Sequence, residues 1–266
     1  MGNLNMLLTC DIGNTNISLG IFDKSNGPPL YEPKATWRIA TDRAKLVDEY
    51  ALLINHLMSL RMISPDDITQ IAICSGVPTL TSIFHHISSE TFKLEPLIVG
   101  SGTRTGIKVL YDNPRDVGAD RIVDAAAALN LYGGPAIIVD FGTATVFDAV
   151  KANGDYLGGA IAPGISIAAD ALYHNASMLR RVELVPPPTA IGKNTIHAIQ
   201  SGLIFGYSEL VKGMVDRFDK ELGGGCKVVA TGGLAEIIQN EITIFDNVSP
   251  HLTLKGLKII QDMNGN

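Results

Sequence analysis

The sequence contains one short pattern twice, as CDIGNTNISLGIF at residues 10–22 and as VDFGTATVFDAV at residues 139–150. Each copy has an aspartate, then a glycine-containing turn with a small hydroxyl residue, then an apolar run typical of a strand. The pattern predicts two β-hairpins of the same design, with Asp11 before the first turn and Asp140 before the second.

The composition is that of a folded α/β protein. A chain of 266 residues is long for one core and sufficient for two domains, and 27 glycines with 6% aromatic residues favour tight turns. The net charge of −6 and the lack of a basic run argue against a nucleic-acid partner. We also expect no membrane partner, because the chain has no apolar stretch of spanning length and no signal peptide. Three scattered cysteines suit a reducing cytoplasm, so a cytoplasmic location is expected.

Expected strands and helices alternate in the first half of the chain. After the first hairpin, a third strand is predicted at 34–39, following a Gly-Pro-Pro turn at 27–29. A helix with Thr41 as its N-cap follows, because apolar residues then recur with the helical period. A buried strand ending at Gly76, a helix at 80–92 and short strands in PLIVG and GIKVLY complete this half.

The second half repeats this order. Strands at 136–150 and 156–161 precede a helix at 165–179, and a long helix is predicted at 194–222. KVVATGGLAEII reads as a strand, a turn and the start of a helix, and an alanine-rich helix at 119–131 links the halves. We therefore predict two duplicated domains, at 1–117 and 118–266.

The repeated turn can bind phosphate. A tight turn with glycine directs backbone N–H groups toward one point, and asparagine or threonine adds side-chain donors. An aspartate beside phosphate requires a cation between the two negative groups. One such turn could be an ordinary turn, but two copies, each opening a domain, favour a polyphosphate held from both sides. The candidate phosphate-binding residues are Asp11, Ile12, Gly13, Asn14, Thr15, Asn16, Ile17, Ser18 and Thr143.

A third glycine-rich site lies in ATGGLAEII at residues 230–238. Gly232 and Gly233 follow an expected strand and precede a helix, so no side chain would obstruct a ligand stacked there. The chain has neither the Gly-x4-Gly-Lys-Ser/Thr loop nor a Gly-x-Gly-x-x-Gly turn after a strand. Both a P-loop fold and a dinucleotide-binding fold are therefore disfavoured.

Together these motifs resemble a known superfamily. The DIGNT and DFGTAT turns with TGG are similar to the phosphate and adenosine motifs of the acetate kinase, sugar kinase and actin superfamily. YDNPRDVGADRIVDAAAAL (111–129), GGAIAPGI (158–165) and IGKNTIHAIQSG (191–202) resemble type III pantothenate kinases more specifically. The resemblance extends from residue 6 to about residue 255, and Val146 is a small departure from the family pattern. It implies two ribonuclease H-like (actin-like ATPase) domains, each with a mixed sheet flanked by helices, and a cleft between them.

The resemblance implies that ATP phosphorylates pantothenate, the first step of coenzyme A biosynthesis. Asp11 would hold Mg²⁺ through water, and the turns at 13–18 and at Thr143 would bind the phosphates. Asp140 matches the position that binds a monovalent cation, K⁺ or NH₄⁺. Gly232 and Gly233 would lie at the adenosine.

The resemblance also implies the substrate site. Asp120 is the candidate catalytic residue, because in GADR it begins a helix from which it could accept the hydroxyl proton. Arg121 suits the carboxylate of pantothenate, and Tyr111, Gly118, Ala119 and Thr195 match substrate-contacting positions. From the residues alone, Asp120 or Thr195 could be a helix cap, Arg121 a surface ion pair and Tyr111 a packing residue.

The resemblance implies a homodimer in which Thr195 reaches the site of the other subunit. The expected helix at 194–222 has small residues beside apolar ones, which would permit close packing against a partner or another domain. Two alternatives stay open. The chain could be a kinase or phosphatase for another substrate within the superfamily, or a non-catalytic regulatory protein such as a transcription accessory factor. The second alternative predicts the loss of Asp11 or Asp120, and both acids are present.

Overall fold

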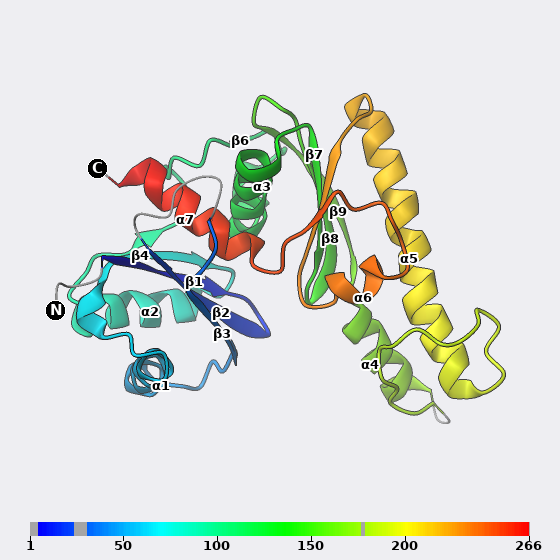
Figure 1. Ribbon diagram of the computed structural model, residues 1–266, viewed down its shortest axis with the longest axis horizontal. Coiled ribbons are helices and arrows are strands. Elements are labelled where there is room, and N and C mark those ends of the chain that lie inside the picture. The colour runs from blue at the N-terminus through cyan, green and yellow to red at the C-terminus, as the bar shows by residue number, and fades with distance from the viewer. Residues whose placement is uncertain (1–4, 24–30, 177–178, 266) are drawn as a thin grey trace. The chain divides into compact units, whose positions relative to one another are not determined.

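The computed structural model describes residues 5–23, 31–176 and 179–265 (Figure 1). The chain divides into two compact units, each an α/β structure with one mixed sheet. The first unit comprises Met1–Ile107, Asp112–Leu131 and Leu252–Asn266, and the second comprises Lys108–Tyr111 and Tyr132–His251. The Gly-Pro-Pro turn expected at 27–29 lies outside the described residues.

The sheet of the first unit is built around the first hairpin. Strands β1, β2 and β3 pair antiparallel, and β4 and β5 add to the β1 edge in parallel. The order across the sheet is β3 (Ala35–Ala40), β2 (Asn16–Asp23), β1 (Met6–Ile12), β4 (Ile68–Ser75) and β5 (Leu97–Ile98).

The sheet of the second unit repeats this arrangement, which confirms the predicted duplication. Strands β7, β8 and β9 are antiparallel neighbours, and β10 and β11 extend the β7 edge in parallel. One additional strand, β6, pairs with β9. The order is β11 (Asn247–Val248), β10 (Lys227–Thr231), β7 (Ala136–Phe141), β8 (Ala144–Val150), β9 (Asp155–Pro163) and β6 (Lys108–Val109).

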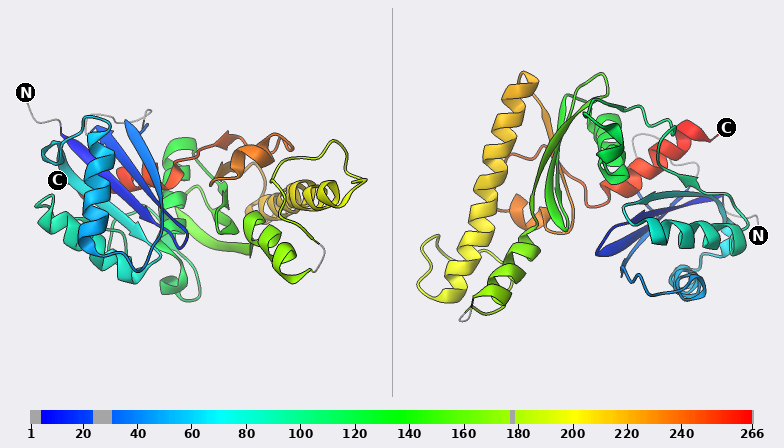
Figure 2. Two further views of the ribbon diagram at one scale, coloured as in Figure 1. Left: turned by 90° about the horizontal axis from the view of Figure 1, so that it is seen from below. Right: turned by 180° about the vertical axis from the view of Figure 1, so that it is seen from behind.

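Helices cover both faces of the first sheet (Figure 2). On one face, α1 (Val47–Ser59) and α2 (Pro78–Glu90) pack Tyr50 and Phe84 together with ring centroids 5.4 Å apart. On the other face lie α3 (Ala119–Tyr132) and α7 (Leu252–Asn264), which share a cluster with Leu7 and Phe22. Two short 3₁₀ helices, at Pro65–Asp67 and Pro114–Asp116, complete the helical segments of this unit.

The start of α1 differs from the prediction. Thr41 does not cap this helix, which begins at Val47 after Leu46, whose backbone N–H donates to Glu49 Oε2 at 2.8 Å. Thr41 instead hydrogen-bonds to the first hairpin turn. The apolar periodicity located the helix correctly, but a hydroxyl residue near its start was not sufficient to identify the cap.

In its described residues, the second unit has the helices α4 (Ile165–Asn175), α5 (Thr195–Leu222) and α6 (Ala235–Gln239). They pack Ile165, Leu203 and Ile238 into one core with the second sheet. Helix α5 matches the predicted range. The Asn194 side chain caps its start by accepting the His197 N–H at 2.9 Å, and Gly223 ends it with a φ of 94°. None of the helices in the described ranges has both the length and the apolar character needed to span a membrane.

The compact units do not follow the division at 117/118. Helix α3, up to Leu131, and helix α7 belong to the first unit, because Val123 and Leu257 are buried in its core. Strand β6 belongs to the second unit, because its register pairs Val109 with Tyr156. The final helix thus completes the first unit although it is last in sequence.

Candidate functional site

The first turn joins β1 to β2 and presents its polar residues at the end of the hairpin. The Gly13 N–H donates to the Asn16 carbonyl oxygen at 3.0 Å, which closes the turn, and Asn14 and Thr15 are exposed. The hairpin register places Asp11 opposite Ser18, both half-buried, and the buried Ile12 opposite the buried Ile17. The two isoleucines fix the hairpin to the core, so the polar pair and the turn lie together at a ligand-accessible end.

Two residues that the sequence analysis did not assign to the site hold this turn. Thr41 Oγ1 donates to the Gly13 carbonyl at 2.7 Å, and the Thr41 N–H donates to the Thr15 carbonyl at 3.0 Å. Arg43 Nη2 donates to Asn14 Oδ1 at 2.8 Å. The turn is therefore attached to the segment after β3, and the cationic Arg43 lies beside it. Thr41 was missed because the sequence favoured a helix cap there.

The first unit also brings together acids that are distant in sequence. Burial raises the pKa of the Cys74 thiol well above its ordinary value, and the carboxylates of Asp11, Asp120 and Asp124 raise this pKa further. All three acids therefore lie within electrostatic range of Cys74, at the end of β4. Asp124 was not predicted, although an acid within the buried run 123–128 of α3 was a usable signal.

Asp120 is exposed in the first turn of α3, as predicted. Its Oδ1 accepts the backbone N–H of Arg121 at 2.9 Å. A Cβ at position 118 would overlap the Asp120 carboxylate, so Gly118 provides the space that this side chain occupies. Ala119 and Arg121 are half-buried on either side. Asp120 thus accepts a hydrogen bond from the adjacent backbone of its own helix, and its side chain is exposed to solvent.

In the second unit, glycines surround the Asp140 carboxylate. The Gly142 N–H donates to the Ala144 carbonyl at 3.0 Å to close the second turn. A Cβ at position 142 would lie 3.2 Å from Asp140 Oδ2, and one at position 232 would lie 2.5 Å from Asp140 Oδ1. Parallel pairing of β10 with β7 places Thr231 opposite Asp140, which brings the TGG segment to the second turn. Gly233, the next residue, is exposed there.

The N-terminus of α4 packs against the same turn. The Gly164 N–H donates to the Thr143 carbonyl at 3.2 Å. A Cβ at position 164 would overlap this carbonyl oxygen and would lie 2.7 Å from the Gly142 oxygen. Gly164 lies in the quoted GGAIAPGI stretch, but the sequence analysis assigned it no role. Thr143 itself is exposed.

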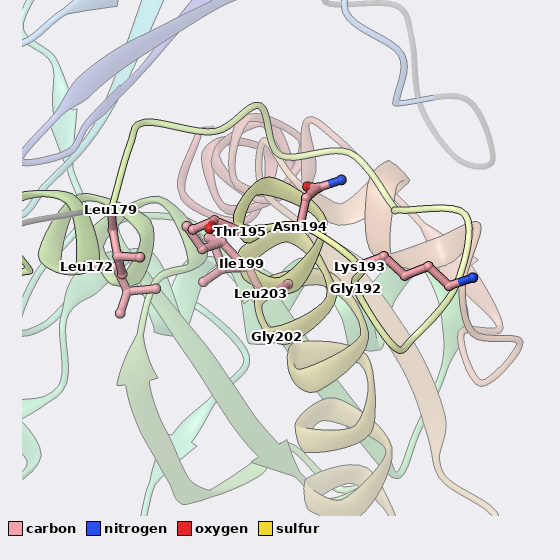
Figure 3. Close-up of a pocket in the computed structure, with 10 residues that line it drawn as sticks. Leu172, Leu179, Gly192, Lys193, Asn194, Thr195, Ile199, Gly202 and Leu203 are labelled. Atoms are coloured by element: carbon pink, nitrogen blue, oxygen red, sulfur yellow. The ribbon is translucent and has the colours of Figure 1, made fainter.

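Thr195 lies in a pocket of about 740 Å³ between α4 and α5 (Figure 3). The lining is mainly apolar, with polar atoms contributed where α5 begins. It consists of Leu172, Leu179, Gly192, Lys193, Asn194, Thr195, Ala198, Ile199, Gly202 and Leu203. Thr195 thus lies at the polar end of this pocket, where α5 begins.

Tyr111 lies at the β6 edge of the second sheet. A Cβ at Gly158, whose φ is 122°, would lie 3.1 Å from a ring carbon of Tyr111, so the ring packs directly on the Gly158 backbone. The preceding Leu110 N–H donates to the Tyr156 carbonyl at 2.9 Å. The ring is half-buried, which is consistent with the packing alternative and leaves part of it accessible.

Comparison with known proteins gives a consistent family assignment. A family model described as type III pantothenate kinase matches residues 7–217. A type III pantothenate kinase from Roseiflexus sp. (strain RS-1) is 50% identical over 259 residues, covering 97% of this chain and 99% of the relative. One from Moorella thermoacetica is 49% identical over 259 residues, covering 97% of this chain and 100% of the relative.

Solved structures agree with the fold. A protein described as a Baf family transcriptional activator, from Campylobacter jejuni, has a TM-score of 0.62 at 20% identity, covering 97% of this chain and 98% of that one. A polyphosphate/ATP-glucomannokinase from Arthrobacter sp. strain KM has a TM-score of 0.50 at 11% identity, covering 98% of this chain and 99% of that one. These likenesses, at 20% identity and below, agree with the predicted fold. With the family match and the near-complete relatives, they lead to one conclusion: this chain belongs to the type III pantothenate kinase family.

Proposed function

We propose that this protein transfers the γ-phosphoryl group of ATP to the primary hydroxyl of pantothenate, giving 4′-phosphopantothenate in the first step of coenzyme A biosynthesis. The observation that carries the proposal is the identity of about half of all residues with type III pantothenate kinases over 97% of the chain. The accessible Asp120 and the two glycine turns supply the chemistry that this reaction needs. Phosphoryl transfer depends mainly on positioning and on neutralising charge, which such turns can provide.

The two turns bind the triphosphate of ATP. In the first, residues 12–18 offer backbone N–H groups and the exposed side chains of Asn14 and Thr15, and nearby Arg43 adds positive charge. In the second, Thr143 contributes its hydroxyl. Gly232 and Gly233 lie at the adenosine. Gly232 lets this segment approach Asp140 and the Phe141 backbone, because a Cβ there would overlap both.

The acids at the turns suit different cations. Within the described residues, no group of three or more His, Cys, Asp and Glu side chains is arranged to hold a metal. A cation at Asp11 would therefore have one carboxylate with water and phosphate oxygens as its ligands, which is the usual manner of Mg²⁺. Bound Mg²⁺ would neutralise charge that develops on the phosphates. Asp140 suits a less demanding monovalent ion, K⁺ or NH₄⁺, which one carboxylate and backbone carbonyls can coordinate.

Asp120 accepts the proton of the pantothenate hydroxyl as its oxygen attacks the γ-phosphorus and the bond to ADP breaks. Its exposure and its place in the first turn of α3 permit this role. The adjacent Arg121 binds the pantothenate carboxylate, and Gly118 and Ala119 line the substrate beside it. Tyr111 contributes its accessible ring edge.

Thr195 completes the site from a second copy of the chain. Thr195 lies in a pocket at the start of α5, and the resemblance to the family assigns this position a substrate contact across a dimer interface. Exposed apolar side chains surround α4 and α5, which supports a homodimer contact there. They include Ile161, Ile167, Leu172, Tyr173, Ile191 and Ile196.

The test is a coupled ADP-release assay with ATP, Mg²⁺ and pantothenate. It is run with K⁺, with NH₄⁺ and with Na⁺ alone at equal ionic strength. The proposal expects turnover that requires pantothenate and increases with K⁺ or NH₄⁺, and an Asp140→Asn variant that loses the increase.

Two results would contradict parts of this proposal. Turnover that is equal in all three salts would remove the cation role of Asp140 and leave the kinase activity intact. Folded protein that binds ATP but gives no turnover with pantothenate in any salt would indicate another acceptor or a regulatory protein.

A further inference from the structure

We infer that Gly256, on the C-terminal helix α7, is a positioning residue for the turn of α3 that carries Asp120 and Arg121. The inference rests on the proposed function, because it assumes the catalytic role of Asp120. All residues involved lie in the first unit. Helix α7 lies beyond the part of the chain that the family model matches, so no motif assigns it a role.

Gly256 is where the backbones of α7 and α3 approach each other. A Cβ at this position would overlap the carbonyl oxygen of Val123 and would lie 2.6 Å from its Cγ1 and 3.1 Å from its carbonyl carbon. Two of these three atoms belong to the backbone, which cannot rotate away as a flexible side chain can. Glycine is unfavourable inside a helix, so its presence here indicates that the space itself is required.

Helix α7 is held firmly against the sheet. Leu254, Leu257 and Ile260 are buried in the core beneath it. Two buried lysines of α7 form ion pairs. Lys255, 8% exposed, pairs with Glu32 of another segment at 2.5 Å, and Lys258, 2% exposed, pairs with Asp262 of the same helix at 2.5 Å.

The C-terminal end of α7 is also hydrogen-bonded to the loop between β5 and β6. The backbone N–H of Arg104 donates to Asn264 Oδ1 at 3.1 Å, and Asn264 Nδ2 donates to the Arg104 carbonyl at 2.8 Å. A side chain at position 256 would therefore force α3 and α7 apart at Val123.

A displacement of α3 at Val123 reaches the proposed active site directly. Val123 is fully buried and lies three residues after Asp120, within one helical turn. Helices shift as rigid units, so Asp120 and Arg121 would move with Val123. Misplacing a catalytic group by about 1 Å can reduce the rate on the order of 100-fold.

The experiment compares Gly256→Ala with two controls in the full-length protein. Leu254→Ala removes a core side chain whose Cδ1 faces Gly20 of the sheet. It should lower the stability of the first unit without adding an atom between α7 and α3. Gly213→Ala changes a glycine inside α5 that has no neighbouring atom within 4 Å of the added Cβ. We measure kcat, the KM values for ATP and pantothenate, the thermal midpoint, and amide hydrogen exchange of residues 119–124.

Gly256→Ala is expected to lower kcat about tenfold to a hundredfold, leave the KM for ATP within about twofold and accelerate exchange at 119–124. Leu254→Ala should lower the thermal midpoint at least as much while keeping kcat. Gly213→Ala should change neither. Adding Val123→Ala to Gly256→Ala removes the Cγ1 overlap, so this double variant should recover part of the lost kcat. If Gly256→Ala alone does not fold, kcat and hydrogen exchange at 119–124 are measured in this double variant instead.

The outcomes separate this inference from the proposed function. Gly256→Ala with wild-type kcat and wild-type exchange at 119–124 would overturn the inference while leaving the kinase assignment intact. Equal loss of kcat in Leu254→Ala would also overturn it, because the effect would then follow stability alone. If the wild-type protein does not phosphorylate pantothenate, the proposed function fails. The exchange comparison then decides whether Gly256 positions α3.

Discussion

At the scale of single residues, Asp120 is the side chain on which the proposed chemistry depends. Asparagine has almost the same shape, and its amide oxygen can still accept the Arg121 N–H that Asp120 accepts at 2.9 Å. It cannot accept the substrate proton. Asp120→Asn should therefore lower kcat about 10²- to 10⁴-fold, the usual contribution of a general base, with the thermal midpoint unchanged. Steady-state kinetics, with ATP affinity by calorimetry, checks this.

Asp116→Asn is a suitable control for this change. Asp116 is an exposed acid shortly before α3, and its Oδ1 accepts only a local hydrogen bond from Asn113, at 2.7 Å. The control should retain its activity. Full activity in Asp120→Asn would remove Asp120 from the mechanism, and loss of ATP binding would show that the variant disturbs more than the proton transfer.

At the scale of elements, the β10–α6 turn offers a test of the proposed adenosine site. Gly232 and Gly224 both have a φ of 89°, but the added Cβ would meet different surroundings. At 232 it would lie 2.5 Å from Asp140 Oδ1 and 2.6 Å from Phe141 backbone atoms, whereas at 224 the nearest atom is 4.0 Å away. Gly224→Ala should therefore cost only the left-handed conformation, about 1–2 kcal/mol of the free energy of unfolding.

Gly232→Ala carries the same conformational cost and adds a displacement of Asp140 and the second turn. We expect it to lose at least a further ~1 kcal/mol by urea denaturation and to weaken ATP binding, which Gly224→Ala should not do. Equal ATP affinities in the two variants would show that Gly232 serves only the backbone turn.

Local patterns predicted the elements that depend on local chemistry. Both hairpins were predicted because their turns need glycine, and α5 because Asn194 caps it and its apolar residues repeat with the helical period. The missed features depend on contacts between distant segments. Thr41 holds the Gly13 turn, the short strand predicted in GIKVLY pairs with β9 of the second sheet, and Gly256 meets Val123. No local rule connects these distant pairs.

At the scale of the whole molecule, duplication explains why one design supplies two phosphate turns. In both units the hairpin is followed by a third antiparallel strand on one side and by parallel strands on the other. In each unit the turn therefore lies where the parallel neighbouring strand ends. In the first unit this end is at Gly76, whose N–H donates to the Ile12 carbonyl oxygen at 3.0 Å, and in the second it is at Gly232. The shared strand order therefore places a glycine turn at the same position in both sheets.

Oligomeric state provides the last prediction. Two groups of exposed apolar residues compete as the dimer contact. One includes Ile196, 49% exposed in the first turn of α5, and the other includes Leu52, 71% exposed on α1. The proposed role of Thr195 requires the first group. Ile196→Glu should therefore convert a particle of twice the 28.3 kDa chain mass into a monomer, whereas Leu52→Glu should leave the dimer intact.

The kinetic result follows from the same geometry. Without the partner's Thr195, the Ile196→Glu monomer should show a raised KM for pantothenate and an almost unchanged affinity for ATP, because both phosphate turns come from one chain. Analytical ultracentrifugation with steady-state kinetics measures both. A monomeric wild-type protein with full activity, or dissociation by Leu52→Glu instead, would refute the shared site. In either case Thr195 would bind nothing in the partner, and its remaining role would be to begin α5 beside the cap Asn194.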